Sequence, residues 1–219
     1  MPAPDQALLS PEQRPLLRGV FHLVAAFAAV VGIVVLVLLA SSPAAYVGGA
    51  IFASSLVLLY ATSAAYHRIT WTPRLRDIVK RLDHSTIFLL IAGTYTPFCL
   101  AVLDTAWGIS MLAVVWGLAG AGVALKLVWP DGPRWLSVAL YVGVGWVALV
   151  ATTELLDWFT ILPLALLALG GVMYTLGGIV YAAQRPDPFP RVFGYHEVFH
   201  LLVVAGSALH FALVAAYVV

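Results

Sequence analysis

Charged residues are scarce in this sequence of 219 residues. Asp, Glu, Lys and Arg make up only 10% of it, whereas hydrophobic residues make up 63%. A soluble domain carries roughly 25% charged residues, and its surface needs more polar cover than this chain can provide. The composition therefore excludes a water-soluble globule and predicts an integral membrane protein.

Two further shortages exclude other classes of protein. The sequence has one cysteine, Cys99, so it cannot form an internal disulfide, and the apolar residues around Cys99 do not suggest a redox role. The formal net charge is only +1, which lacks the basic excess of a nucleic-acid-binding domain. We therefore expect no nucleic-acid partner.

Long apolar runs fill most of the chain. About 20 apolar residues in a helix cross the ~30 Å of bilayer hydrocarbon, and only helices satisfy their own backbone in a single span. Seven runs qualify, at about 19–41, 46–67, 83–103, 107–129, 134–153, 158–183 and 195–218. The sequence thus predicts an all-α polytopic membrane protein: a bundle of seven transmembrane helices over residues 17–219, after a short cytoplasmic segment of residues 1–16.

The positive charges fix the predicted orientation. All eleven Lys and Arg residues lie before the first run or in or directly beside the second, fourth and sixth connections. The remaining connections carry only Asp104, Glu154 and Asp157. Since cytoplasmic loops are enriched in Lys and Arg, we expect a multi-pass protein of the inner (plasma) membrane, with a cytoplasmic N-terminus and the C-terminus outside.

Three histidines are predicted to meet near the cytoplasmic face. His196 and His200 are spaced i, i+4, so they share one face of the last helix. His67 ends the second run, which brings it to the same depth in a seven-helix bundle. Three imidazoles and one open position are the ligand set of a catalytic zinc ion. We therefore predict that His67, His196 and His200 bind Zn²⁺.

Two other polar residues lie close to this depth. Asp83 begins the third run and is predicted to be catalytic, either as a fourth ligand or as a base for the attacking water. It also fits an N-cap of the third helix. Ser63 lies one turn before His67, where its hydroxyl can orient a ligand, the water or a substrate carbonyl. The alternative role for Ser63 is that of a small packing residue between helices.

The other histidines are weaker candidates. His84 follows Asp83 and faces about 100° away from it, so it is a spare ligand only. His210 lies about 15 Å beyond His200 along the helix, too far for a shared ion, and is expected to form a buried hydrogen bond. We expect His22, near the inner end of the first run, to be structural.

The last helix also matches a second pattern. His196-Glu197-Val198-Phe199-His200 fits the H-E-x-x-H motif of zinc proteases, in which the glutamate is the general base. The extended motif requires a glycine and a further histidine at the positions of Val203 and Gly206. Because both are missing, the protease interpretation is the less favoured one.

Several motifs together point to a family. They occur in the order Ser63-Ala-Ala-Tyr-His67, Leu82-Asp83-His84-Ser85, Ala92-Gly93-Thr94-Tyr95-Thr96-Pro97, His196-Glu-Val-Phe-His200 and His210-Phe211. Over about residues 15–219 this pattern closely resembles the bacterial hemolysin III proteins, part of the progestin and adipoQ receptor (PAQR) family. The resemblance implies a seven-helix bundle with zinc on His67, His196 and His200, and with Asp83 and Ser63 as the acid and serine beside it. The same polar set looks like that of the alkaline ceramidases.

These observations lead to one principal functional hypothesis. We expect a zinc-dependent hydrolase of amide-linked membrane lipids, or a protein of lipid homeostasis built on that chemistry, with membrane lipids or a fatty acid as partners. The alternatives are a receptor or sensor with a structural zinc and a pore-forming cytolysin. The sequence has no regular row of polar side chains through several spans, which a water-filled pore would need, and this argues against the cytolysin. The sequence does not name the lipid, a regulating ligand or the oligomeric state.

Overall fold

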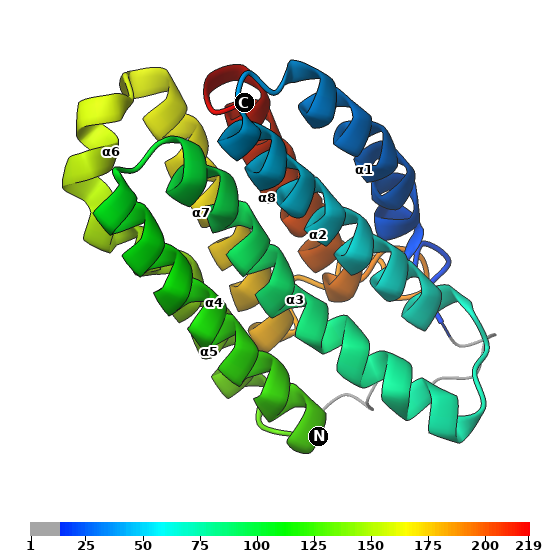
Figure 1. Ribbon diagram of the computed structural model, residues 1–219. Helices are drawn as coiled ribbons and strands as arrows, with labels where there is room; N and C mark the ends of the chain where they lie inside the picture. The colour runs from blue at the N-terminus through cyan, green and yellow to red at the C-terminus, as the bar shows by residue number, and fades with distance from the viewer. Residues whose placement is uncertain (1–13) are drawn as a thin grey trace.

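The structure is a computed structural model that describes residues 14–219; most of the predicted N-terminal segment 1–16 lies outside this range. The described part is helical apart from one isolated bridge between Phe189 and Phe193. Figure 1 shows the helices in one elongated bundle. In chain order they are α1 (Val20–Leu39), α2 (Pro43–Arg68), α3 (Pro73–Ala101), α4 (Thr105–Val128), α5 (Arg134–Gly145), the 3₁₀ helix η3 (Trp146–Ala151), α6 (Thr152–Trp158), α7 (Ile161–Ala183) and α8 (Tyr195–Tyr217).

Seven membrane-spanning segments are present in the described residues. Six are single helices, and the fifth, Arg134–Trp158, combines α5, η3 and α6. Large apolar side chains such as Val24, Phe27 and Leu38 of α1 point outwards, which a soluble protein would avoid but a lipid-facing helix requires. The predicted all-α, seven-span architecture is therefore confirmed.

Local sequence explains where several helices begin. The Ser42 hydroxyl accepts a hydrogen bond from the Ala45 amide at 3.1 Å, directly before Pro43 at the first position of α2. Asp104 caps α4 by accepting from the Trp107 amide at 2.9 Å. Both caps satisfy amide groups that a helix N-terminus leaves unpaired. They lie at the breaks between apolar runs.

The helix that carries the third apolar run begins ten residues before that run. The helix α3 begins at Pro73, after Thr72, and continues without a break through the charged residues that precede Asp83. Hydropathy marks the part of a helix that can enter lipid, but the helix itself continues until a residue breaks it. Asp83 consequently lies inside α3, and the alternative N-cap role for it is excluded.

The fifth span also departs from the continuous helix that was expected. The α-helical hydrogen-bonding pattern gives way to η3 after Gly145. Tyr95 of α3 compensates, because its hydroxyl donates to the Gly145 carbonyl at 2.6 Å and accepts from the Ala148 amide at 2.7 Å. Irregular backbone is tolerated at membrane depth only when such partners exist.

The chain alternates between the two ends of the bundle. Figure 1 shows the α2–α3 and α4–α5 connections and the start of α8 at one end, and the C-terminus at the other. All the connections rich in Lys and Arg lie at the first end, which we call the basic end. That the basic end is cytoplasmic stays a prediction, which reporter fusions at Val219 and near Arg185 would test.

Close packing of α2 against α3 helps to position the polar residues at the basic end. A Cβ atom on Gly48 would lie only 2.6 Å from the Cα atom of Pro97. A Cβ on Gly93 would lie 2.4 Å from the Ser55 hydroxyl oxygen. Since real side chains do not approach so closely, glycine at these positions lets the two helices approach each other. The helix that carries Ser63 and His67 is thereby held against the helix that carries Asp83.

Candidate metal centre and its cavity

The structure brings His67, His196 and His200 together. The three come from the last turn of α2 and the first two turns of α8, and their candidate ligand nitrogens lie within 4.8 Å of one another. The Nε2 atoms of His67 and His196 are 3.1 Å apart. Two imidazole nitrogens on one tetrahedral zinc ion are separated by about 3.3 Å, given Zn–N bonds of about 2.0–2.1 Å. The arrangement therefore fits one metal ion, whose identity stays a prediction.

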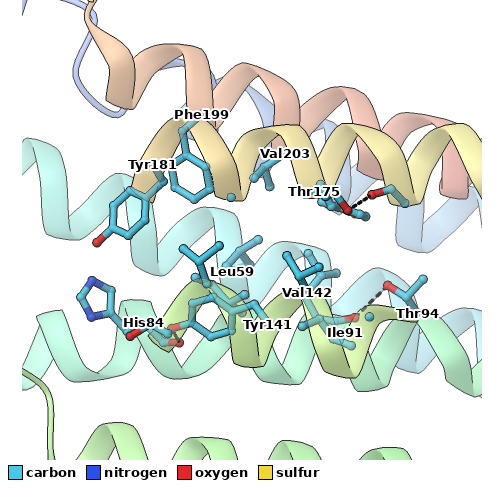
Figure 2. A pocket seen from close by; sticks show the side chains of 18 of the residues that line it. Leu59, His84, Ile91, Thr94, Tyr141, Val142, Thr175, Tyr181, Phe199 and Val203 are labelled. Carbon is cyan, nitrogen blue, oxygen red and sulfur yellow. Dashed lines mark hydrogen bonds between the residues drawn. The ribbon is translucent and has the colours of Figure 1, made fainter. Parts of the chain in front are cut away.

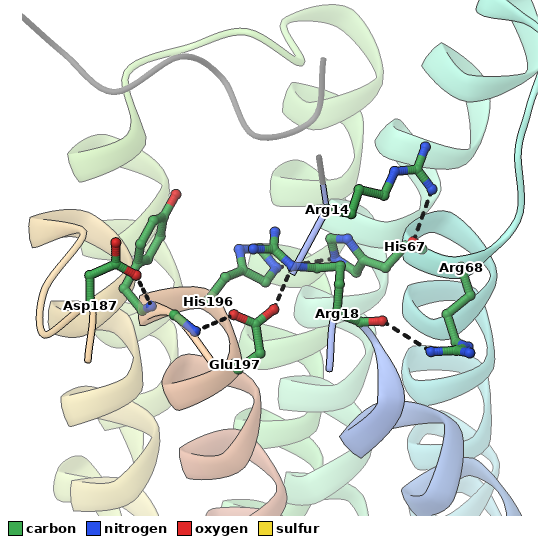
Figure 3. Close-up of polar contacts among 9 residues, drawn as sticks. Arg14, Arg18, His67, Arg68, Asp187, His196 and Glu197 are labelled. Carbon is green, nitrogen blue, oxygen red and sulfur yellow. Dashed lines mark hydrogen bonds and ion pairs between the residues drawn. The ribbon is translucent and has the colours of Figure 1, made fainter. Parts of the chain in front are cut away.

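The segment before α1 packs against His67. Gly19 adopts a left-handed φ of 73°, and a Cβ there would lie 2.8 Å from the Cβ of His67. The Arg14 guanidinium donates to the His67 carbonyl at 3.1 Å (Figure 3). Glycine is required by both the backbone conformation and the close approach. This segment thus holds the C-terminal turn of α2, and with it the first candidate ligand, in place.

Glu197 does not take the position of a protease base. It is fully buried, and its Oε1 pairs with Nε of Arg18 at 2.5 Å. Its Oε2 accepts from the Gly194 amide at 2.8 Å, which caps α8. Figure 3 shows the carboxylate turned toward Arg18. Both oxygens are engaged in anchoring helices, so the geometry does not support the zinc-protease alternative.

Asp83 and Ser63 are buried together beside the histidines. The Ser63 hydroxyl lies close enough to the Asp83 side chain to interact with it, and both residues line the cavity that His67, His196 and His200 also line. Among residues 14–219, the group spaced to hold one ion contains the three histidines but not Asp83. This favours Asp83 as a group next to the metal over Asp83 as a fourth ligand. Ser63 therefore interacts with the carboxylate of Asp83 in addition to packing between helices.

His22 contributes to the site in a way that the sequence analysis missed. Its ring stacks on the ring of His200, with centroids 3.7 Å apart and planes 8° from parallel. Tyr60 covers it from another side at 5.0 Å. Within the described residues, neither ring nitrogen of His22 has a hydrogen-bond partner. The sequence did hold a signal for this contact: His22 lies near the inner end of the first span, at the same predicted depth as the three candidate ligands.

The remaining histidines lie outside the three-histidine group. His210 Nε2 lies 3.1 Å from the Leu167 carbonyl, as expected for a buried structural histidine. His84 lines the cavity, and its carbonyl accepts from the Tyr141 hydroxyl at 3.0 Å. Neither belongs to the group that could share an ion.

An elongated, largely apolar cavity of about 760 Å³ adjoins the histidines. Figure 2 shows Phe199 and Val203 of α8 facing Leu59 of α2 and Val142 of α5 across it. Ligand pockets typically measure about 300–1,000 Å³ and are lined mainly by apolar side chains. A cavity of this volume and lining can hold an acyl chain, with polar chemistry at the histidine end.

Fold and site together define a multi-pass membrane protein with a three-histidine centre at the end of an apolar cavity. The chain matches the haemolysin-III related family over residues 11–211 and belongs to that family. The resemblance to hemolysin III proteins is therefore confirmed, and with it a location in the cell membrane.

Individual relatives support this assignment. The chain is 37% identical over 169 residues to the hemolysin-3 homolog of Bacillus subtilis (strain 168), covering 77% of this chain and 76% of that protein. It is 33% identical over 204 residues to hemolysin-3 of Bacillus cereus, covering 92% and 90% respectively. A more distant relative is the adiponectin receptor protein of Drosophila melanogaster, 26% identical over 202 residues, covering 74% of this chain and 40% of that protein. The chain is thus a hemolysin III-like membrane protein related to PAQR receptors.

Proposed function

We propose that this protein hydrolyses amide-linked membrane lipids at a zinc ion held by His67, His196 and His200. The observation that carries the proposal is the convergence of these ligands at the polar end of an acyl-sized apolar cavity. A site reached from the bilayer and lined by apolar side chains suits a lipid whose acyl chain lies in the cavity.

The residues of the chain have separate roles in the proposed reaction. Zinc, when bound, polarises the amide carbonyl and makes a water molecule more acidic. Asp83 accepts a proton as water attacks the carbonyl carbon, and returns it to the nitrogen as the C–N bond breaks. The products are a fatty acid and an amine. Ser63, whose hydroxyl lies close to the Asp83 side chain, orients this carboxylate.

A receptor or sensor is the second candidate function. His67 belongs to α2 and the other two ligands to α8, so a bound ion would tie two helices together. The Drosophila relative carries the name of a receptor. A purely structural ion would stabilise the bundle without turnover, and this difference separates the two functions. A pore-forming role, the third hypothesis, has only the names of the bacterial relatives in its favour.

Turnover of a short-chain ceramide tests the proposal. Purified protein in detergent should release fatty acid, lose this activity when a chelator removes the metal and regain it on addition of zinc. The control is the Asp83→Asn variant, which should bind zinc but remain inactive. Zinc-loaded protein that turns over no acyl-amide lipid, yet loses thermal stability on chelation, would favour the sensor.

A further inference from the structure

Lys126 is a buried cation that lines the cavity. The residue is only 3% exposed, near the C-terminus of α4. Its ammonium donates a short hydrogen bond to the Ser137 hydroxyl of α5. An ammonium group has three donors, and among residues 14–219 no carboxylate forms an ion pair with Lys126. A buried charge without a counter-charge is costly, so this position calls for an anion.

The acid whose charge acts on Lys126 is already paired with another lysine. Asp131 lies close enough to influence Lys126 electrostatically. Its carboxylate, however, accepts a hydrogen bond from Lys80 at 2.9 Å and is 78% exposed. That hydrogen bond, together with the charge of Lys80, lowers the pKa of Asp131. Asp131 therefore stays ionised and paired with Lys80, at the solvent-exposed edge of the cavity.

A second cation, Arg134, lines the same cavity and lies one turn before Ser137 on α5. The Arg134 guanidinium lies over the ring of Tyr181, 5.2 Å from its centroid. The ion pairs in the described part of the chain are Arg18–Glu197 and Lys80–Asp131, so Arg134 also has no carboxylate partner there. A lysine and an arginine together form a common phosphate-binding pair, since Arg offers a planar fork of donors and Lys a compact charge.

General features of membrane proteins do not explain the inward position of Lys126. Cations gather at cytoplasmic helix ends and interact favourably with helix C-termini. Such side chains normally extend so that the charge reaches water or the headgroups. Arg74, which is exposed and does not line the cavity, has this ordinary environment. Lys126 instead is turned beneath α5, toward Ser137 and the cavity.

We propose that Lys126 and Arg134 bind the phosphate headgroup of a lipid whose acyl chain occupies the cavity. As a statement about substrate this rests on the proposed function, and it names the substrate class as a phosphate-bearing N-acyl lipid. The binding site itself does not depend on hydrolysis. Lys126, Arg134 and the three histidines line one cavity, so one lipid can reach both the cations and the histidines.

Binding of dodecyl phosphate tests the site without turnover. The full chain, in an uncharged detergent, is titrated with dodecyl phosphate, dodecanol or inorganic phosphate, and tryptophan fluorescence reports binding, because Trp146 lines the cavity. Wild-type protein should bind dodecyl phosphate at least tenfold more tightly than dodecanol. Lys126→Met and Arg134→Gln should each weaken dodecyl phosphate binding about tenfold, while Arg74→Gln leaves it unchanged.

The controls separate the alternatives. Lys126→Met removes a buried charge and should fold, since such replacements are often neutral or stabilising; Arg134→Gln gives an independent second variant. An equal loss in Arg74→Gln would show general surface attraction and overturn the proposal. Inorganic phosphate that binds as tightly as dodecyl phosphate would overturn the assignment to a lipid. Dodecyl phosphate binding is measured without turnover, and zinc content is measured on the same preparations, so a failure of the zinc hydrolase proposal stays distinguishable from a failure of this one.

Discussion

Two parts of the cavity lining are built in different ways. The helices α2 and α8 are unbroken and supply all three candidate metal ligands. The fifth span, which also lines the cavity, changes from α5 to η3, and its backbone depends on the hydroxyl of Tyr95. Regular helices fix the ligand spacing, whereas the broken span shapes the space for a ligand. Substitutions of the ligands on α2 and α8 should therefore change metal binding, and substitutions that affect the fifth span should change substrate binding without loss of zinc.

The largest expected effect is loss of the metal. His196→Ala and His200→Ala should each lose most of the bound zinc, because two imidazoles hold zinc much less tightly than three. The matched control is His210→Ala on the same helix, because His210 contacts the Leu167 carbonyl instead. Metal analysis of the folded variants gives the result. Equal zinc loss in all three variants would contradict the assignment of ligands.

Asp83→Asn should separate chemistry from metal binding. We expect the zinc content to be unchanged and ceramide turnover to fall by roughly 100-fold or more, because asparagine cannot accept the proton. Zinc content and rate are measured on the same preparation. If zinc is lost in parallel with activity, Asp83 is itself a ligand, and the structural-metal alternative gains support.

Tyr95→Phe tests the role of the fifth span. The variant loses the hydrogen bonds at 2.6 and 2.7 Å to the backbone of the fifth span, each worth about 0.5–1.5 kcal/mol. We expect a lower melting temperature and a several-fold higher KM for short-chain ceramide, with normal zinc content. Reduced zinc in this variant would show that the fifth span and the metal ligands are not independent.

The smallest expected effect concerns His22. Its contact with His200 is a stacked one, and its ring nitrogens have no partner among the described residues. His22→Phe should therefore preserve zinc affinity, whereas His22→Ala should weaken it by about threefold to tenfold, less than the loss of a ligand. Competition with a chelator measures both. Loss of zinc in His22→Phe to the level of His196→Ala would instead make His22 a ligand.

Much of this arrangement followed from the sequence. The apolar runs and the alternation of Lys and Arg gave seven spans, and with them a common depth for His67, His196 and His200. The break at η3 did not follow, because an apolar run has the same hydropathy whether or not its helix is regular. The pairing of Arg18 with Glu197 required contacts between segments that are 179 residues apart.

Lys126 illustrates what the linear pattern hides. In the sequence, Lys126 looks like any other basic residue near the end of a span, such as Arg74 or Arg81. Its side chain is buried because of the rotation of α4 against α5. Depth in the membrane can be read from hydropathy, but the direction of a side chain around its helix depends on the neighbouring helices.

The zinc content of protein purified without a histidine tag tests the central claim most directly. The account predicts about one zinc ion per chain, lost on chelation together with ceramide turnover and restored with it. Elemental analysis coupled to size separation measures the ratio of metal to protein. Metal-free protein that remains folded and fully active on ceramide would contradict the account.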